Sequence, residues 1–196
     1  SLRRRASELE EVIEQRTSAL REQTDRLLES DREKSILVAR LKAQSEDFER
    51  LSLEDALTGI GNRRNLDDRL AKAFERALET RLPLSFALFD IDEFKRINDQ
   101  YSHAAGDHAL VAVAQALQQG VDGRGSIARW GGEEFAALFE GMPLEEARLL
   151  CEQLRERVQA IDCSEFAPGW SMTISGGVAE RTGLSHHEKL VSRADA

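Results

Sequence analysis

The chain has little of several residue types, and each shortage excludes a class of protein. Among 196 residues only two are cysteines, Cys151 and Cys163, and neither has a second Cys or a His at zinc-finger spacing. The cysteine content therefore excludes a disulfide-stapled scaffold and indicates reduced thiols. No apolar run is long enough to cross a membrane, and no signal peptide is recognisable.

Positive charge is also in short supply, with 27 Lys and Arg residues against 36 Asp and Glu and a net charge of −9. Without a basic tail or patch we expect no nucleic-acid partner. We expect a cytoplasmic protein. Because the chain begins at Ser1 rather than Met, we also expect a fragment of a longer protein. A membrane anchor in the rest of that protein is compatible with this expectation.

Glycine and proline are absent from residues 1–53, where 11 basic and 12 acidic residues nearly balance. Two series of positions recur there with a seven-residue period. They are Ala6, Ile13, Leu20, Leu27, Lys34, Leu41 and Phe48, and Leu2, Leu9, Arg16, Gln23, Ser30, Leu37, Gln44 and Leu51. This period predicts a long helix with a coiled-coil seam, whose polar middle third fixes register and partner number. We expect a parallel homodimer through residues 1–53; the alternative is a solvated single helix or a flexible linker.

The periodicity alternates in residues 54–196, the predicted globular domain. Helical patterns occupy 63–80, 105–119, 144–160 and 186–196, and strand-like runs occupy 84–90, 126–130, 134–139 and 170–175. The helix at 144–160 is expected to bury Leu149, Leu150, Leu154 and Val158. Mixed strands and helices with a hairpin predict an α+β domain, with a central sheet covered by helices on one face or both.

The segment Gly131-Gly132-Glu133-Glu134-Phe135 stands between two strand-like runs. The pattern predicts a β-hairpin with a Gly-Gly turn. The two carboxylates then lie at a bared edge, where they suit a hard cation such as Mg²⁺. The alternative is an ordinary turn with solvated acids.

A second acidic segment, Asp90-Ile91-Asp92, follows the apolar run that ends at Phe89. A carboxylate at the end of a buried strand, with a helix starting behind it, can hold a metal where backbone N–H groups also receive phosphate. The alternative is that Asp90 and Asp92 serve as a helix N-cap and a first-turn acid.

Four blocks of residues resemble the GGDEF domain of bacterial diguanylate cyclases, in the family's order and at its spacing. The blocks are residues 55–64 (DALTGIGNRR), 89–99 (FDIDEFKRIND), 101–110 (YSHAAGDHAL) and 129–135 (RWGGEEF). The resemblance covers residues 53–196. It implies a fold similar to nucleotide cyclases and the polymerase palm, and the condensation of two GTP into cyclic di-GMP with Mg²⁺ or Mn²⁺.

The resemblance also implies a role for each matched acidic residue. Asp90 and Glu133 are expected to bind the metal, assisted by the Ile91 carbonyl, and Glu133 to act as general base or to orient the attacking hydroxyl. Glu134 is expected to be either a second metal contact or a partner in a structural hydrogen bond.

The substrate positions come from the same blocks. Glu93, Phe94 and Lys95 are expected to cradle the phosphates, although Lys95 is equally interpreted as a solvated helix lysine. Asn98 and Asp107 are expected to hold guanine, whose N1–H and N2–H₂ donors suit a carboxylate. The alternatives are a helix cap at Asn98 and the N-cap of the next helix at Asp107. Leu57 and Leu110 are expected to line the base pocket, or simply to be core.

Two departures from the family pattern carry expectations. Many members have an Arg-x-x-Asp product site, where this chain has Asp122-Gly123-Arg124-Gly125. We therefore expect no feedback inhibition at this segment. The family's last helix continues with a Lys and an Arg that contact the terminal phosphates, whereas this chain stops at Ala196. We expect either a longer protein or impaired triphosphate affinity.

Three functions are compatible with the residues. We expect the first, a dimeric diguanylate cyclase whose helix transmits a signal from an upstream sensor. The second is a catalytically silent domain that binds GTP or cyclic di-GMP. The third is a coiled-coil module whose globular part recruits a partner.

Overall fold

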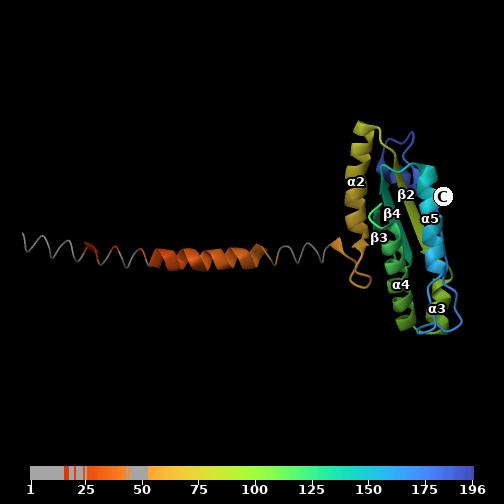
Figure 1. The fold of residues 1–196 in the computed structure, drawn as a ribbon, viewed down its shortest axis with the longest axis horizontal. Helices are drawn as coiled ribbons and strands as arrows, with labels where there is room; N and C mark the ends of the chain where they lie inside the picture. The colour runs from red at the N-terminus through yellow and green to blue at the C-terminus, as the bar shows by residue number, and fades with distance from the viewer. Residues whose placement is uncertain (1–15, 18–19, 21–23, 25, 43, 45–52) are drawn as a thin grey trace, which may run out of the picture. The chain divides into compact units, whose positions relative to one another are not determined.

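A computed structural model of the chain describes residues 16–17, 20, 24, 26–42, 44 and 53–196 (Figure 1). The chain separates into two units, Ser1–Arg50 and Leu51–Ala196. In the first unit, residues 26–42 form a continuous helix. Its large apolar side chains are 56–64% exposed; they are Leu27, Leu28, Ile36, Leu37, Val38 and Leu41.

The predicted heptad positions are helical wherever the structure describes them. These are Arg16, Leu20, Leu27, Ser30, Lys34, Leu37, Leu41 and Gln44. The other members, Leu2, Ala6, Leu9, Ile13, Gln23, Phe48 and Leu51, lie outside the described residues. Since the described apolar members are exposed within one chain, burying them requires a partner helix.

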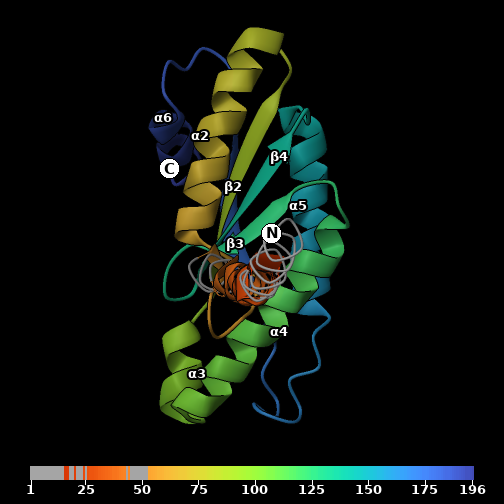
Figure 2. The same cartoon turned by 90° about the vertical axis from the view of Figure 1, so that its left-hand side faces the viewer.

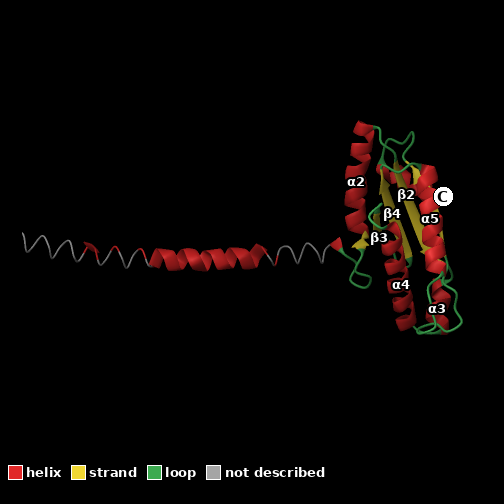
Figure 3. Cartoon of the chain, in the orientation of Figure 1, coloured by secondary structure: helices red, strands yellow, loops and turns green. Residues whose placement is uncertain are grey.

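The second unit is built around a five-stranded sheet with the order β1-β3-β4-β2-β5. Its elements are β1 (Gly61–Asn62), α2 (Arg63–Thr80), β2 (Leu84–Ile91), α3 (Phe94–Gln100), α4 (His103–Val121), β3 (Ser126–Arg129), β4 (Glu134–Glu140), α5 (Leu144–Gln159), β5 (Ile174–Glu180) and α6 (His187–Ala194). The β1–β3 pair is parallel and the other pairs are antiparallel. The α+β fold predicted from the sequence is confirmed (Figure 3).

Side chains of β2 alternate between the two faces of the sheet, because successive residues of a strand point in opposite directions. Phe86 and Leu88 pack in one core with residues of α2 and α6. Ala87 and Phe89 pack in the other core with residues of α4 and α5. Figures 1 and 2 show α2 and α5 on opposite sides of the sheet. The same alternation directs Asp90 to the face that carries Phe86 and Leu88.

Most predicted helices and strands are found within a few residues of their expected bounds, with two corrections. Leu149 is 68% exposed, and Ala147 takes the expected place in the buried stripe of α5. The last strand begins at Ile174 and not at Trp170. The Gly176-Gly177 pair concealed this strand, since glycine is depleted in strands. Among the described residues, no helix combines the length and the apolar character needed to span a bilayer.

Candidate active site

The strand register brings the predicted acidic residues together at one end of the sheet. Asp90 in β2 lies directly opposite Glu134 in β4 and opposite Ser175 in β5. The Ile91 N–H donates to the Glu133 carbonyl at 3.3 Å. Because directly paired residues share a face of the sheet, the Asp90 and Glu134 side chains leave the sheet on the same side.

The hairpin between β3 and β4 has a wider loop than the predicted Gly-Gly turn. The Trp130 and Gly131 N–H groups donate to the Glu134 carbonyl at 2.8 and 3.3 Å, which closes a loop over residues 130–133. Neither Gly131 nor Gly132 has a positive φ. A β-carbon on Gly131 would collide with the Glu134 carboxylate, whereas one on Gly132 would meet nothing within 4 Å. Gly131 thus gives space to Glu134, and Gly132 leaves the hairpin tip open to a ligand.

Several negative charges repel one another at this end of the sheet. Burial raises the pKa of the Asp90 carboxyl above its ordinary value, and the neighbouring charges of Glu133, Glu134 and Asp92 raise it further. Like charges in close proximity disfavour ionisation of each group. A divalent cation bound here would relieve that repulsion.

The donor set fits Mg²⁺ held partly by a substrate. Within residues 53–196 and the described parts of the preceding helix, no three His, Cys, Asp or Glu side chains are grouped as a ready-made metal site. Mg²⁺ in phosphoryl-transfer sites is commonly bound by one or two carboxylates, with waters and substrate phosphates completing the octahedron. Asp90, Glu133 and the Ile91 carbonyl supply hard oxygen donors of that kind.

Neither acid of the Asp90-Ile91-Asp92 segment caps a helix, so the alternative interpretation of both residues is wrong. Asp90 belongs to β2, and Asp92 accepts a hydrogen bond from the Ser175 hydroxyl at 2.6 Å. The N-cap of α3 is Glu93, which makes no side-chain capping bond. Its φ of 57° lies in the left-handed region, which is uncommon for a residue other than glycine.

Helix α3 and the start of α4 project beyond the end of the sheet where β2 finishes (Figure 2). Glu93 and Lys95 are exposed, and Phe94 is half-buried against the core. The predicted phosphate segment therefore presents its polar residues to solvent beside Asp90.

The expected guanine residues lie on two adjoining helices. Asn98 is inside α3, and Asp107 is inside α4, whose N-cap is Ser102 accepting from the Ala105 N–H. Neither is a cap, so both alternative interpretations are wrong. A β-carbon on Gly106 would overlap the Asn98 carboxamide and lie 3.2 Å from Phe94 Cζ. Gly106 thus permits α3 and α4 to approach, which places Asn98 beside the residue preceding Asp107.

We predict that Gly106→Ala displaces the Asn98 side chain from its place between these two helices. The new methyl group overlaps the Asn98 side chain, so overpacking costs about 1–3 kcal/mol of stability and displaces Asn98. The expected result is a lower affinity for GTP in a titration monitored together with the melting temperature. Ala104→Gly, at an exposed position of the same helix, is the control for altered helix propensity. An unchanged GTP affinity in Gly106→Ala would contradict the inferred role of the approach.

The two expected pocket leucines differ in environment. Leu110 is 3% exposed and belongs to the core beneath α4, and Leu57 is 38% exposed in the segment before β1. Leu110 therefore combines core packing with its place one turn after Asp107, and Leu57 is open to a ligand.

An ion pair that the sequence did not single out links the start of the domain to the hairpin. Arg129 donates to both carboxylate oxygens of Asp55 at 3.2 and 3.3 Å and to the Gly132 carbonyl at 2.7 Å. Burial alone would raise the pKa of Asp55, but hydrogen bonds from Thr58 and the Arg129 charge lower it overall. Both residues lie in the matched blocks, and only the fold shows that they meet.

The turn at residues 122–125 connects α4 to β3. Asp122 is the left-handed C-cap of α4, and Arg124 donates to the Gly120 carbonyl at 3.1 Å. A β-carbon on Gly125 would lie 2.7 Å from the Leu138 carbonyl oxygen. These residues hold the turn against β4.

A cavity of about 280 Å³ opens beside the carboxylates. Its lining includes Leu88, Asp90, Glu134, Ser175 and Ala194. The α6 end of the chain therefore borders the same space as the acidic residues.

Comparisons with known proteins identify the family of the chain. The family model described as diguanylate cyclase, GGDEF domain, matches residues 52–196. Diguanylate cyclase DgcP of Pseudomonas aeruginosa is 38% identical over 150 residues, which cover 76% of this chain and 22% of that protein. The chain spans from about a fifth to a half of the length of the curated relatives, 22% for DgcP and 50% for DgcS of Shewanella oneidensis.

Solved structures show the same fold. The coiled coil and GGDEF domain of DgcB from Caulobacter crescentus, in complex with c-di-GMP, matches with a TM-score of 0.78 and 30% identity over 83% of this chain and 87% of that one. The active GGEEF domain of a diguanylate cyclase from Vibrio cholerae matches with a TM-score of 0.64 and 35% identity over 68% of this chain and 85% of that one. The fold and the family model agree, and the chain belongs to the GGDEF domain family.

Proposed function

We propose that the protein is a diguanylate cyclase that condenses two GTP molecules into cyclic di-GMP and releases two pyrophosphates. The observation that carries the proposal is the convergence of Asp90, Glu133 and Glu134 at one end of the sheet, next to the α3–α4 pair that bears Asn98 and Asp107. The acidic residues proposed to bind a metal are therefore near the polar residues proposed to bind the nucleotide base.

The reaction requires the 3′-hydroxyl of one nucleotide to attack the α-phosphorus of another. A new P–O bond forms, the bond to pyrophosphate breaks, and the hydroxyl proton is transferred to a base. Such a transfer depends mainly on alignment and on neutralisation of phosphate charge. We assign the proton acceptor, or the orientation of the hydroxyl, to Glu133 at the hairpin.

Asp90, Glu133 and the Ile91 carbonyl would hold Mg²⁺ or Mn²⁺, with Glu134 as a further contact. When bound, the metal activates the hydroxyl and stabilises the leaving pyrophosphate. The backbone of Glu93, Phe94 and Lys95, with the Lys95 ammonium, would receive the phosphates. Leu57 and Leu110 would contact the base.

Guanine selectivity is assigned to Asn98 and Asp107. We predict that Asp107→Asn weakens discrimination of GTP over ATP by about 10–100-fold, because a charged hydrogen bond to the guanine donors is lost. Competition between GTP and ATP in a turnover assay measures the effect. Asp99→Asn, at an exposed α3 position, is the matched control. Unchanged selectivity in Asp107→Asn would remove this residue from the base site.

Each domain offers one nucleotide site, so two must face each other to close the ring. We propose that residues 1–53 form the parallel coiled coil that pairs the catalytic domains, 54–196, and relays the state of an upstream sensor. The exposed apolar stripe of residues 26–42 supports the pairing. Many GGDEF domains also bind product at an Arg-x-x-Asp segment; Asp122 and Gly125 replace both residues, and we propose no inhibition there.

We predict that Leu37→Glu uncouples the dimer. A charge in the coiled-coil seam opposes helix pairing. In the dimer the second catalytic domain is present at a millimolar effective concentration, so at micromolar protein the loss of pairing should lower activity by about 100-fold. Specific activity should then rise with protein concentration. Ser35→Glu adds the same charge outside both heptad series and should leave the dimer intact. Equal activity of the two variants in a dilution series would argue against dimer control.

The proposed activity is tested by incubating the chain with Mg²⁺ and either GTP or ATP. We expect cyclic di-GMP from GTP alone. GTP binding without product would instead support a silent nucleotide-binding domain.

A further inference from the structure

A loop of residues 160–173 joins α5 to β5 and lies beside α3 (Figure 3). Its Trp170 is half-buried between two side chains that frame α3. The Arg96 guanidinium lies 5.5 Å from the Trp170 ring centroid, and the Tyr101 ring meets the indole edge-on at 6.4 Å and 88°. A cation over an indole face and an edge-to-face aromatic pair are both attractive geometries.

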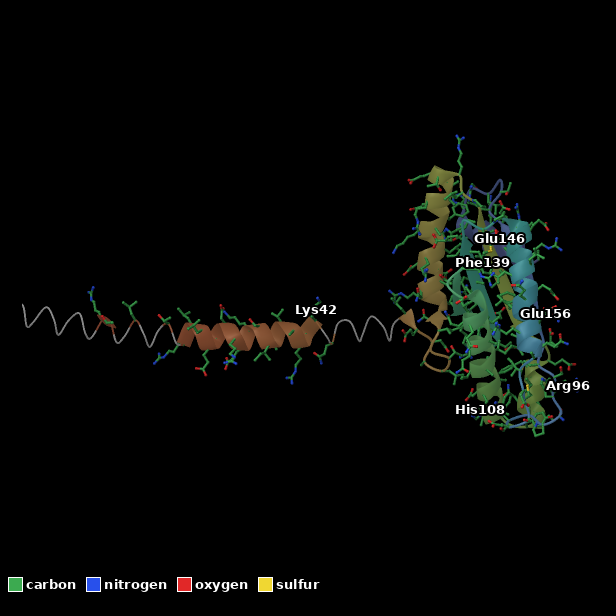
Figure 4. All side chains as sticks on the ribbon, in the orientation of Figure 1. Lys42, Arg96, His108, Phe139, Glu146 and Glu156 are labelled. Carbon is green, nitrogen blue, oxygen red and sulfur yellow. The ribbon has the colours of Figure 1, made fainter. Side chains whose placement is uncertain are left out.

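The same loop contacts the chain before and after α3. The Thr173 carbonyl accepts from the Asp92 N–H at 3.1 Å, and the Pro168 carbonyl accepts from the Tyr101 hydroxyl at 2.9 Å. The Phe166 ring stacks on His108 of α4 at 6.1 Å. Arg96 and His108 lie at the same end of the domain (Figure 4). The loop thus holds α3 at its entry, its middle and its exit.

The opposite side of α3 faces the proposed base site. Helix residues two apart point in different directions, so Arg96 and Asn98 cannot face the same neighbour. Arg96 contacts Trp170, and Asn98 approaches Gly106 of α4. Arg96 also donates to the Glu93 carboxylate at the entry to α3. The position of the Trp170 ring is therefore transmitted to both ends of the segment proposed to bind nucleotide.

We propose that Trp170 is a positioning residue that fixes α3, and with it residues 93–95 and Asn98, for GTP. The assignment rests on the proposed function, because that function gives these residues their nucleotide roles. Trp170 itself touches no reacting atom. It acts through Arg96 and Tyr101.

The choice of tryptophan supports a specific use of its ring. The indole Nε1 is buried without a hydrogen-bond partner among the described residues. A buried unpaired donor costs stability, so phenylalanine would serve better if the ring were only filler. Tryptophan is the aromatic residue that binds a cation most strongly, and the contact with Arg96 uses that property.

The test is titration of the full chain with α,β-methylene-GTP and Mg²⁺, which reports binding without turnover. We expect Trp170→Leu to weaken binding by about tenfold, since small misplacements of binding groups are costly. Trp170→Phe retains a ring that binds a cation less strongly, so it should recover part of the lost affinity. Arg96→Ala should weaken binding similarly, and the double variant Arg96→Ala with Trp170→Leu should lose less affinity than the two single losses combined, because both changes remove the Arg96–Trp170 contact.

Leu66→Ala is the control for general destabilisation, because Leu66 is 1% exposed in the core under α2. It should lower the melting temperature and leave the affinity unchanged. If Trp170→Leu binds the analogue as tightly as Leu66→Ala does, the positioning role is wrong, whatever the turnover of the parent. If the parent binds the analogue and makes no cyclic di-GMP, the proposed function fails and the titration still tests Trp170.

Discussion

Glu133→Gln is expected to abolish cyclic di-GMP formation while the domain stays folded. The substitution keeps the shape of the side chain and the backbone bond from the Ile91 N–H to the Glu133 carbonyl. It removes the charge that would hold the metal and receive the hydroxyl proton. Metal-assisted stabilisation of phosphoryl transfer is worth several kcal/mol, so turnover should fall by about 10³-fold or more.

The measurement is chromatographic detection of product, with circular dichroism to verify the fold. Glu140→Gln is the matched control, because Glu140 ends the same strand β4 and pairs with Arg76 at 2.9 Å far along the register from Asp90. Its turnover should equal that of the parent. Comparable product from Glu133→Gln and the parent would move the catalytic metal away from the hairpin.

Asp90→Asn is expected to inactivate the protein and at the same time to stabilise its metal-free form. Burial and the charges of Glu133, Glu134 and Asp92 raise the pKa of the Asp90 carboxyl in the folded state. The folded protein therefore holds a proton that the unfolded chain has lost, in the window just above the ordinary carboxyl pKa. Stability without metal falls as pH rises through this window, and the neutral amide removes that fall.

The gain in melting temperature of Asp90→Asn over the parent should thus grow from acid to neutral pH in the presence of a chelator. Adding Mg²⁺ with GTP should stabilise the parent and not the variant, since binding to the folded state raises its stability. Turnover should fall by about 10³-fold or more, for the reason given for Glu133. A variant less stable than the parent at neutral pH would show that the carboxylate repulsion is compensated.

The sequence predicted the fold where local pattern and burial agree. The apolar run before Asp90 was predicted to be a strand and forms most of β2. The segment at 63–80, with its helical periodicity, was predicted to be a helix and forms α2. The prediction that Leu149 is buried was wrong, because an apolar residue on a helix need not lie on the buried face of that helix. Ala147 lies on the buried face of α5 instead, where its small side chain packs in the core.

The sequence predicted which residues belong to the candidate site, but it did not predict which residues contact one another. Asp90, Glu133 and Glu134 were identified from their motifs, yet the contact between Asp55 and Arg129 joins residues 74 positions apart. Likewise Trp170 was expected in a strand, because aromatic and β-branched residues favour strands, whereas it packs on α3 from a loop. Long-range pairing of this kind has no local signal in one sequence.

We propose that the site around Asp90, Glu133 and Glu134 joins two GTP molecules. The most direct measurement follows GTP, cyclic di-GMP and pyrophosphate together over time with Mg²⁺. We expect GTP to disappear as cyclic di-GMP accumulates with two pyrophosphates for each cyclic di-GMP, and a chelator to stop all three changes. GTP that binds and stays intact, or phosphate released without cyclic di-GMP, would contradict it.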